Sequence, residues 1–495
     1  MSKKKKRPII GAAGHLMEDA MARYQPLLDA ENYKKLQAEI LQPLSPTMRI
    51  NLLKHDPAVI SERLQKLYDW KLTPIAYCPS GFRVDPGENS LSNTIEHRMG
   101  DFYIQEAASM LPAELFELAP NQHPLVLDMA ASPGGKTIHL ADRINDQGLI
   151  IANDSSHSRL TALQIVLQKW GVINQAVTCM PGELFGELYP EVFDVVLLDA
   201  PCSMEGLRTT SSHPMRAISD KERQRLAQRQ KKMLESALRA ARVDGQIVYS
   251  TCTLAPEEDE SVLAAVLEKF PDVFEIDNMQ SRLPFHARGL NSYGQIHYPQ
   301  EVSHSIRLWP HLCHTAGFFA TRLTKKNQIQ NLTVPRTHRS KPIEYSRMPI
   351  RDMKNLCKIL MSEYGFDLEK LIDQLDLSVC TNKDELLLIP NRVLIDFIDL
   401  YPVSQGLRFG SFNGQEFSPS HEFSARFGLQ FQTGKIHIPD ELLPNWLRGE
   451  DLRGYTTLEY PKGKIVIITD QNGRNLGRGK VQSAQLKNLL PNRLF

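Results

Sequence analysis

Two cysteines stand at the ends of apolar segments, where strand-end side chains of an enzyme often do chemistry. Cys202 closes an Asp-Ala-Pro-Cys motif after the apolar segment 192–200. Cys252 closes a Tyr-Ser-Thr-Cys motif at the end of the segment 245–252. Adjacent strands of a parallel sheet lie about 4.8 Å apart. If the two segments are neighbouring strands, both thiols face one cleft.

This arrangement suits methylation of carbon 5 of a cytosine. A thiolate that adds to carbon 6 converts the ring into an enamine, whose carbon 5 then attacks a methyl donor. A free thiol has a pKa of about 8.5, so the site must favour ionisation. Asp199 is placed to hold the proton that makes carbon 6 electrophilic. A base must afterwards remove the carbon-5 proton before the thiol can leave.

Three other interpretations of the thiols remain open. Most free cysteines are small buried hydrophobic residues. A redox pair is a second interpretation, although the CxxC motif that usually marks one is absent. Enzymes that methylate amino groups carry an Asn/Asp-Pro-Pro-aromatic tetrad, and here the tetrad at 199–202 ends in a thiol instead.

A glycine turn at 128–137 predicts a cofactor site. It joins the apolar segment 125–131 to a helix, in the crevice where doubly wound sheets bind ligands. The turn is neither a G-x-G-x-x-G fingerprint nor a phosphate loop, which disfavours NAD and ATP. Asp154, after the predicted strand 149–153, offers a carboxylate to ribose hydroxyls. The predicted cofactor-binding residues are Asp128, Ala130, Ala131, Ser132, Pro133, Gly134, Gly135, Lys136, Asp154 and Asp199.

Alternating strand and helix patterns over residues 116–325 predict a Rossmann-like α/β domain with a mostly parallel sheet. The expected strands are 125–131, 149–153, 176–180, 192–200, 245–252 and 317–323. The expected helices are 156–170, one capped by Ser219, and 256–270. The last helix would carry Glu257, Glu258 and Asp259 in its first turn, where the helix dipole favours acids.

The rest of the chain divides by pattern into smaller regions. These are a basic flexible tail (1–24), an N-terminal α+β region (25–115), a linker (326–350), a small α/β domain (351–415) and a C-terminal β module (420–495). Residues 461–495 hold seven basic side chains and one acidic, Asp470, a local excess of +6. This excess predicts a phosphate-binding surface, with a merely solvated surface as the alternative.

Composition excludes several classes of protein. The formal net charge of +1 says nothing about partners. No apolar run approaches the roughly 18 residues of a membrane span, and no apolar region follows the basic residues Lys3–Arg7 as in a signal peptide. Seven cysteines without a CxxC pair predict neither disulfides nor a metal site, and we expect a cytoplasmic protein.

The motifs together resemble those of the Sun/Nop-type RNA cytosine-5 methyltransferases. The matching segments are 49–54 (Arg-x-Asn-x-x-Lys), 102–112, 128–136, 199–203 and 250–253. Segments 445–451 and 477–491 resemble the PUA-like C-terminal domain of the bacterial RsmF type, which methylates small-subunit ribosomal RNA in the decoding region.

The resemblance implies roles that spacing alone does not assign. It makes S-adenosylmethionine the cofactor, Cys252 the nucleophile and Cys202 the residue that assists product release. Asp199 and Lys136 would orient a flipped-out cytosine. The N-terminal region and the PUA-like module would bind structured RNA, namely small-subunit ribosomal RNA or the 30S subunit. A monomer without membrane contact is expected.

Two positions depart from the family pattern. Met204 stands where relatives have glycine, and Pro181 stands where they have an aspartate near the adenine. Two rival functions also remain. One is a tRNA or DNA cytosine-5 methyltransferase, the DNA enzyme using Cys202 as nucleophile. The other is a ribosome-assembly RNA binder without turnover.

Overall fold

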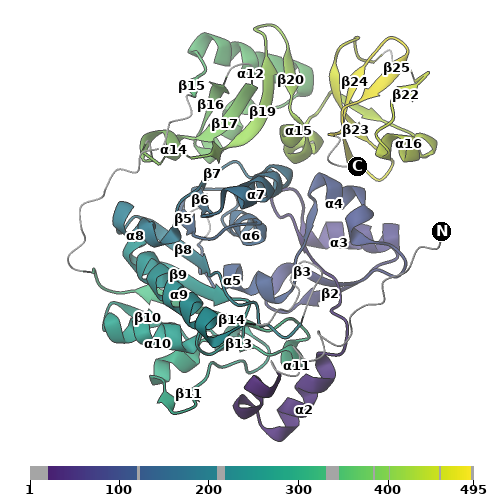
Figure 1. The fold of residues 1–495 in the computed structure, drawn as a ribbon. Helices are drawn as coiled ribbons and strands as arrows, with labels where there is room; N and C mark the ends of the chain where they lie inside the picture. The colour runs from purple at the N-terminus through teal and green to yellow at the C-terminus, as the bar shows by residue number, and fades with distance from the viewer. Residues whose placement is uncertain are drawn as a thin grey trace, which may run out of the picture.

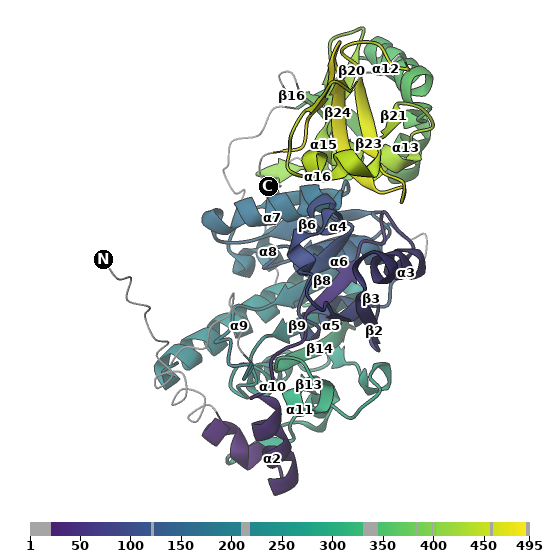
Figure 2. The same ribbon diagram turned by 90° about the vertical axis from the view of Figure 1, so that its right-hand side faces the viewer.

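A central α/β domain carries an N-terminal domain on one flank and two C-terminal units along one end (Figures 1 and 2). The computed structural model describes residues 21–119, 123–208, 218–329, 345–382, 385–397, 399–400, 402–455 and 459–491. Among these residues, no helix combines the length and apolarity that crossing a membrane requires.

The central sheet has the strand order β10-β14-β9-β8-β5-β6-β7-β18, with β13 paired to β14. Its parallel strands are β5 (Leu125–Asp128), β6 (Leu149–Asn153), β7 (Gln175–Thr178), β8 (Phe193–Asp199) and β9 (Ala241–Thr251). The antiparallel ones are β10 (Phe274–Ile276), β13 (Ile306–Leu308) and β14 (Phe318–Lys325). The predicted Rossmann-like fold is confirmed, and every expected strand is present.

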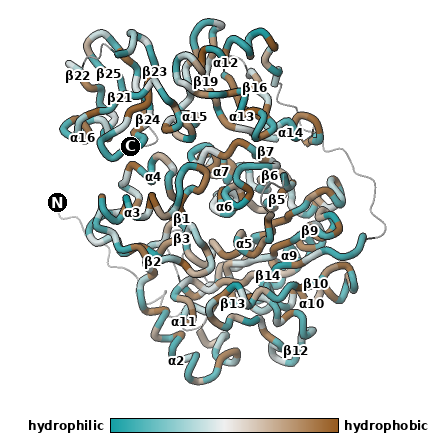
Figure 3. The backbone as a smooth tube through the Cα atoms, turned by 180° about the vertical axis from the view of Figure 1, so that it is seen from behind, coloured by the Kyte–Doolittle hydropathy of each residue, from teal (hydrophilic) through white to brown (hydrophobic). Residues whose placement is uncertain are grey.

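Side chains alternate between the two faces of this sheet, as the strand period requires. Val126 and Ile150 pack in a core with the helices α6 (Gly135–Arg143) and α7 (His157–Trp170). Leu127 and Ile151 pack on the opposite face. The helices of that face are α8 (Phe185–Leu188), α9 (Asp220–Ala240) and α10 (Glu260–Lys269). Hydrophobic residues accordingly follow the central strands in Figure 3.

Two helix starts can be compared with their predictions. Ser219 caps α9 as expected, since its hydroxyl accepts the Glu222 N–H at 3.2 Å. The helix expected from residue 256 begins only at Glu260. Glu258 and Asp259 precede it and are fully buried, so they are not solvated acids of a first turn. Their carboxylates instead accept hydrogen bonds from the strand-end loops.

The N-terminal domain is built on an antiparallel sheet of order β2-β3-β1-β4. Residues 21–24, at the end of the predicted flexible tail, are helical and Tyr24 is fully buried; residues 1–20 lie outside the described part. The elements are α2 (Ala30–Glu39), β1 (Thr47–Ile50), α3 (Pro57–Tyr68), β2 (Lys71–Ile75), β3 (Cys78–Asp85), α4 (Ile95–Met99), β4 (Phe102–Ile104) and α5 (Leu111–Glu114). Helix α2 packs on α11 (Pro310–Cys313) of the central domain.

The small α/β unit extends beyond its predicted limits at both ends. Its sheet, of order β15-β16-β17-β19-β20, starts inside the expected linker, of which 330–344 are not described. The elements are β15 (Ser346–Arg347), α12 (Ile350–Tyr364), α13 (Leu368–Leu375), β16 (Leu377–Asn382), β17 (Glu385–Pro390), α14 (Asn391–Ile395), β19 (Leu407–Phe412) and β20 (Phe417–Pro419). A strand that was not predicted, β18 (Ser404–Gln405), lies between β17 and β19 in the chain but pairs with β7 of the central sheet.

The C-terminal module is a second small sheet, of order β21-β23-β24-β25-β22. Its elements are β21 (Lys435–His437), α16 (Leu443–Leu447), β22 (Leu452–Arg453), β23 (Ile465–Thr469), β24 (Asn475–Val481) and β25 (Gln485–Asn488). Helix α15 (His421–Phe427) packs against both β19 and β24 and so joins the two units. Ile95 and Met99 of α4 enter the core of the module, which ties it to the N-terminal domain.

Candidate active site

The structure brings the two predicted thiols together. The Sγ atoms of Cys202 and Cys252 are 3.0 Å apart, and both residues are partly exposed. The cause is the sheet topology: β8 and β9 are parallel neighbours, with Asp199 opposite Ser250 at their carboxyl ends. Both thiols therefore lie at the edge where doubly wound sheets bind ligands.

Lys136 and Asp199 form an ion pair beside the thiols. Lys136 Nζ lies 2.7 Å from Asp199 Oδ2, and the Ser250 hydroxyl donates to Asp199 Oδ1 at 2.8 Å. Burial lowers the pKa of Lys136, but the charges of Asp199 and a Cys252 thiolate outweigh this and raise the pKa above its usual value. The ammonium is therefore retained at neutral pH.

The Cys202 thiol has a different electrostatic environment. Its hydrogen bond with Cys252 and its burial raise the pKa of Cys202 well above the usual value, and the Glu258 carboxylate acts in the same direction. Since only the thiolate is a strong nucleophile, this environment favours Cys202 as a thiol that donates a hydrogen bond.

The turn between β5 and α6 is compact and tightly packed. Gly134 has φ +114°, and a Cβ there would meet Leu163 and Val166 of α7 at about 3 Å. A Cβ on Gly135 would come within 2.9 Å of the Tyr103 ring. Glycine is required at 134 by its backbone conformation and at 135 by the close approach of Tyr103.

Asp128 carries an unsatisfied acceptor next to this turn. Its Oδ2 accepts the Thr137 hydroxyl at 2.7 Å, whereas its Oδ1 is buried and has no partner among the described residues. Burial raises the pKa of Asp128 to about 7, and the Asp199 charge adds to the effect. A buried orphan acceptor usually marks a place for a missing partner, so the residue fits a ligand with a hydrogen-bond donor.

Asp154 is almost completely buried and holds the same turn. Its carboxylate accepts the Ser132 N–H at 3.3 Å and the Ser156 N–H at 2.9 Å, and Arg159 pairs with it at 3.4 Å. Arg159 also donates to the Ser132 carbonyl at 2.6 Å. Sequence reasoning missed Arg159, because a half-exposed arginine on a helix carries no pattern that separates it from surface charge.

Met204 lies in the left-handed region of backbone conformation, with φ +62°, and its side chain is exposed. A side chain is unfavourable in this conformation, whereas glycine adopts it freely. The family pattern of glycine at this position thus has a backbone cause.

The Arg-x-Asn-x-x-Lys motif docks the N-terminal domain on the turn between β5 and α6. Arg49 is fully buried, pairs with Asp142 of α6 and donates to the Gly135 carbonyl at 3.3 Å. Asn51 donates to the carbonyls of Gly100 and Trp170, at the ends of α4 and α7. These side chains are engaged within the protein and are not available to RNA phosphates.

The predicted basic surface of 461–495 is smaller than the sequence suggests. Arg474 is buried and pairs with Asp470 and Glu96, and Arg478 is largely buried against the Pro419 carbonyl. Lys464 pairs with Glu363. Of the described basic residues in this range, Lys462, Lys480 and Lys487 are exposed.

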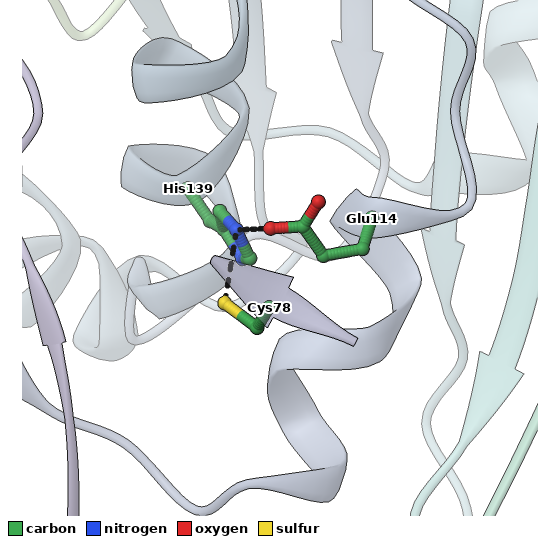
Figure 4. A group of neighbouring side chains, drawn as sticks. All are labelled: Cys78, Glu114 and His139. Atoms are coloured by element: carbon green, nitrogen blue, oxygen red, sulfur yellow. Dashed lines mark hydrogen bonds and ion pairs between the residues drawn. The ribbon is translucent and has the colours of Figure 1, made fainter. Parts of the chain in front are cut away.

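A second cluster of reactive residue types lies away from this edge, where Cys78, Glu114 and His139 meet (Figure 4). His139 Nε2 is 2.9 Å from Glu114 Oε1 and 3.9 Å from Cys78 Sγ. One ring nitrogen faces both partners, so the histidine cannot relay a proton between them. Arg143 pairs with Glu114, and its charge disfavours a bound cation.

The fold and the strand-end thiols define an α/β enzyme, and comparisons with known proteins define its family. The description "16S rRNA methyltransferase RsmB/F" matches residues 115–324, and "N-terminal domain of 16S rRNA methyltransferase RsmF" matches 16–107. Curated proteins called ribosomal RNA small subunit methyltransferase F are similar over most of the chain. The one from Aeromonas hydrophila is 31% identical (92% of both chains), and the one from Erwinia tasmaniensis 30% (95% of this chain, 94% of the other).

Solved structures show the same fold. A methyltransferase homologue from Pyrococcus horikoshii is 31% identical with a TM-score of 0.53, covering 62% of this chain and 98% of its own. NSun6 from the same organism gives a TM-score of 0.53 at 22% identity, covering 63% and 98%, and supports the fold alone. The chain belongs to the RsmB/F family of 16S rRNA methyltransferases, and it is an RNA methyltransferase.

Proposed function

We propose that this enzyme methylates carbon 5 of a cytosine in small-subunit ribosomal RNA, in the decoding region, with S-adenosylmethionine as cofactor and Cys252 as covalent nucleophile. The observation that carries the proposal is the thiol pair, 3.0 Å apart and beside the Lys136–Asp199 ion pair. Relatives called ribosomal RNA small subunit methyltransferase F support the choice of RNA.

The cofactor would occupy the crevice at the turn between β5 and α6. The orphan acceptor of Asp128, the small residues Ala130–Gly135 and the buried Asp154 carboxylate suit a ligand that carries amino and hydroxyl donors. When bound, S-adenosylmethionine supplies an electrophilic methyl group. Lys136 follows this turn in α6 and pairs with Asp199 at the end of β8, the strand that leads to Cys202, so we assign to these two residues the orientation of the cytosine.

The proposed reaction begins when Cys252 Sγ adds to carbon 6 and the ring electrons move toward carbon 5. Asp199 holds the proton on the cytosine that makes this addition favourable. Carbon 5 takes the methyl group, and a base then removes the carbon-5 proton. Those electrons restore the ring double bond, and the carbon–sulfur bond breaks with its electrons returning to Cys252. The Cys202 thiol stabilises the departing sulfur by a hydrogen bond.

RNA binding is assigned to surfaces outside the catalytic cleft. Because the Arg49 motif is buried, the N-terminal domain would contact RNA through other side chains. The C-terminal module, which we propose to be PUA-like, offers Lys462, Lys480 and Lys487 to phosphates. We also propose a cytoplasmic monomer.

Two variants test the proposal with small-subunit RNA and the methyl donor. We expect Cys252→Ala to be inert and to form no covalent adduct, because the nucleophile is lost. We expect Cys202→Ala to accumulate an RNA–protein adduct that survives denaturing gel electrophoresis, because release is slowed. Cys357→Ala, in the small α/β unit, is the matched control and should retain wild-type turnover without an adduct.

The opposite pattern contradicts the assignment. An adduct with Cys252→Ala but not with Cys202→Ala would make Cys202 the nucleophile, as in the DNA enzymes. Bisulfite sequencing of the modified RNA identifies the target, and a product methylated on an amino group instead would refute the carbon-5 chemistry.

A further inference from the structure

Two side chains hold the peptide groups on either side of Cys202. Gln230 of α9 donates from Nε2 to the Pro201 carbonyl at 2.9 Å. Glu258 accepts the Ser203 N–H on Oε2 at 3.0 Å. The same Gln230 amide donates to Glu258 Oε2 at 2.8 Å, which links the two side chains into one unit. We refer to them as the Glu258–Gln230 pair.

Both members of this pair are fully buried. Glu258 Oε1 and Gln230 Oε1 have no hydrogen-bond partner in the described part of the chain. A fixed carboxylate with a free oxygen in such a place strongly affects the charge of its neighbours, because water does not screen it.

The other charged groups around Glu258 do not neutralise it. Its backbone carbonyl accepts the Tyr249 hydroxyl. Burial raises the pKa of the Glu258 carboxyl and the Glu205 charge adds to this, whereas the hydrogen bonds from Ser203 and Gln230 lower it. Arg223 pairs with Glu205, and Arg307 pairs with Asp259. Within the described residues, no cation is recorded against the Glu258 carboxylate itself.

The two thiols are thus flanked by opposite charges. Lys136 acts on Cys252 from α6, and Glu258 acts on Cys202 from the loop before α10. The Lys136 ammonium attracts a thiolate, whereas the Glu258 carboxylate repels one. The two sulfur atoms are 3.0 Å apart, close enough for one thiol to donate a hydrogen bond to the other.

We propose that Glu258, held by Gln230, is the positioning residue that keeps Cys202 a protonated thiol and thereby leaves Cys252 as the nucleophile. The catalytic meaning of this inference rests on the proposed function. The order in which the two thiols ionise does not depend on the proposed function and can be tested separately. As a protonated thiol, Cys202 donates a hydrogen bond to the Cys252 sulfur before that sulfur adds to the cytosine. It donates the same hydrogen bond when the Cys252 sulfur leaves the cytosine.

The wild-type protein gives the first test, without RNA or methyl donor. Iodoacetamide reacts with thiolates, and mass spectrometry of peptides reports the alkylation rate of each cysteine between pH 6 and 10. We expect Cys252 to react at lower pH than Cys202. Cys78 and Cys313, whose pKa values burial raises to about 12, serve as unreactive references. A profile in which Cys202 ionises first overturns the inference.

Glu258→Gln gives the second test, since glutamine keeps an acceptor for the Ser203 N–H but removes the charge. We expect the alkylation rate of Cys202 at pH 8 to rise about tenfold relative to that of Cys252, the effect of one pKa unit. Glu257→Gln is the matched control, because this neighbouring acid is partly exposed and pairs with Arg23. It should leave the ratio unchanged.

The outcomes separate the inference from the proposed function. An unchanged ratio in a folded Glu258→Gln protein, judged by circular dichroism, overturns the inference even if methyl transfer to RNA is cytosine-5 specific. If Glu258→Gln does not fold, the wild-type pH profile still tests the order of ionisation and overturns the inference if Cys202 ionises first. Conversely, if Cys252 ionises before Cys202 but the RNA product is methylated at a position other than carbon 5 of cytosine, only the proposed function is refuted.

Discussion

Within the described residues, two clusters that combine cysteine with ionisable side chains differ in position, exposure and charge. The Cys202–Cys252 pair lies at the carboxyl ends of β8 and β9, partly exposed and beside a lysine. The Cys78–Glu114–His139 cluster lies between β3, α5 and α6, where all three side chains are buried. A substrate can reach the first cluster, whereas the second is closed by packing.

The difference extends to charge. Burial raises the pKa of Cys78 to about 12, and burial together with Arg49 lowers the pKa of His139 to about 4. The second cluster is thus held as a neutral thiol and a neutral imidazole around one paired carboxylate. Such a network supports the docking of the N-terminal domain on α6 but does not activate a nucleophile. We therefore expect position at the sheet edge, more than residue identity, to make a thiol of this chain reactive.

The largest effect is expected when the lysine is removed from the first cluster. We expect Lys136→Met to lower kcat for methyl transfer by about 100- to 1000-fold, the usual cost of losing one preorganised electrostatic partner. The substitution keeps the length of the side chain but leaves Asp199 unpaired. Methyl incorporation into RNA under saturating substrate measures the effect.

Lys269→Met is the control, because this exposed lysine pairs with Glu235 on the outer face of the domain. It should change kcat by less than about twofold, since a surface ion pair contributes little. If Lys136→Met keeps more than a tenth of wild-type kcat, the lysine is dispensable and the electrostatic contrast between the clusters fails.

The second cluster predicts an effect on stability with little effect on chemistry. The pKa of His139 in the folded protein, about 4, lies below its ordinary value of 6.5. The contribution of the neutral imidazole to the free energy of unfolding is therefore complete above pH 6.5 and is lost as the pH falls toward 4. Burial raises the pKa of Glu114, but His139 and Arg143 lower it to about 2, which extends the loss from pH 4.5 downward.

His139→Asn should therefore flatten the pH dependence of the free energy of unfolding between pH 6.5 and 4, by on the order of 3 kcal/mol. Urea unfolding at several pH values measures this. Methyl transfer by the folded variant at pH 7.5 should stay near wild type. A large loss of kcat without a loss of stability would place the second cluster in the chemistry, and a Zn²⁺-dependent stabilisation that the variant lacks would make it a metal site.

The smallest expected effect concerns backbone strain at the edge of the first cluster. Met204→Gly should raise the free energy of unfolding by up to about 1 kcal/mol, because glycine adopts the observed φ of +62° without strain. Thermal unfolding measures the change, and Met361→Gly, in the interior of α12, is the control that should destabilise. A destabilised Met204→Gly would mean that packing of the methionine outweighs the strain.

The sequence predicted the central fold well because strand periodicity is a local signal. The expected strand 149–153 coincides with β6, and the expected adjacency of the two thiol-bearing strands is confirmed by the pairing of β8 with β9. The resemblance to Sun/Nop-type enzymes is confirmed by the family comparison. The assignment of Cys252 as nucleophile and the individual cofactor residues stay predictions.

Other errors have a common physical cause, namely that long-range contacts override local patterns. The sequence predicted Glu258 and Asp259 as acids in the first turn of a helix. In the structure both precede α10 and are buried, where they accept hydrogen bonds from Ser203 and Thr251. The sequence predicted Arg474 and Arg478 as part of a phosphate-binding surface. In the structure they instead contact Glu96 and the Pro419 carbonyl, which are remote in sequence. The strand β18 carries no pattern of its own, because its pairing with β7 alone defines it.

The sequence by itself determined which residue types stand at the ends of the strands, since each motif is local: Cys202 after Asp-Ala-Pro, Cys252 after Ser-Thr, and the glycine turn after β5. Only the tertiary structure decided the charge around each thiol. Lys136 in α6 and Glu258 in the loop before α10 come from separate elements, and each interacts with a different thiol. Electrostatic interactions depend on distance in space and on burial, and neither is written in the spacing of residues along the chain.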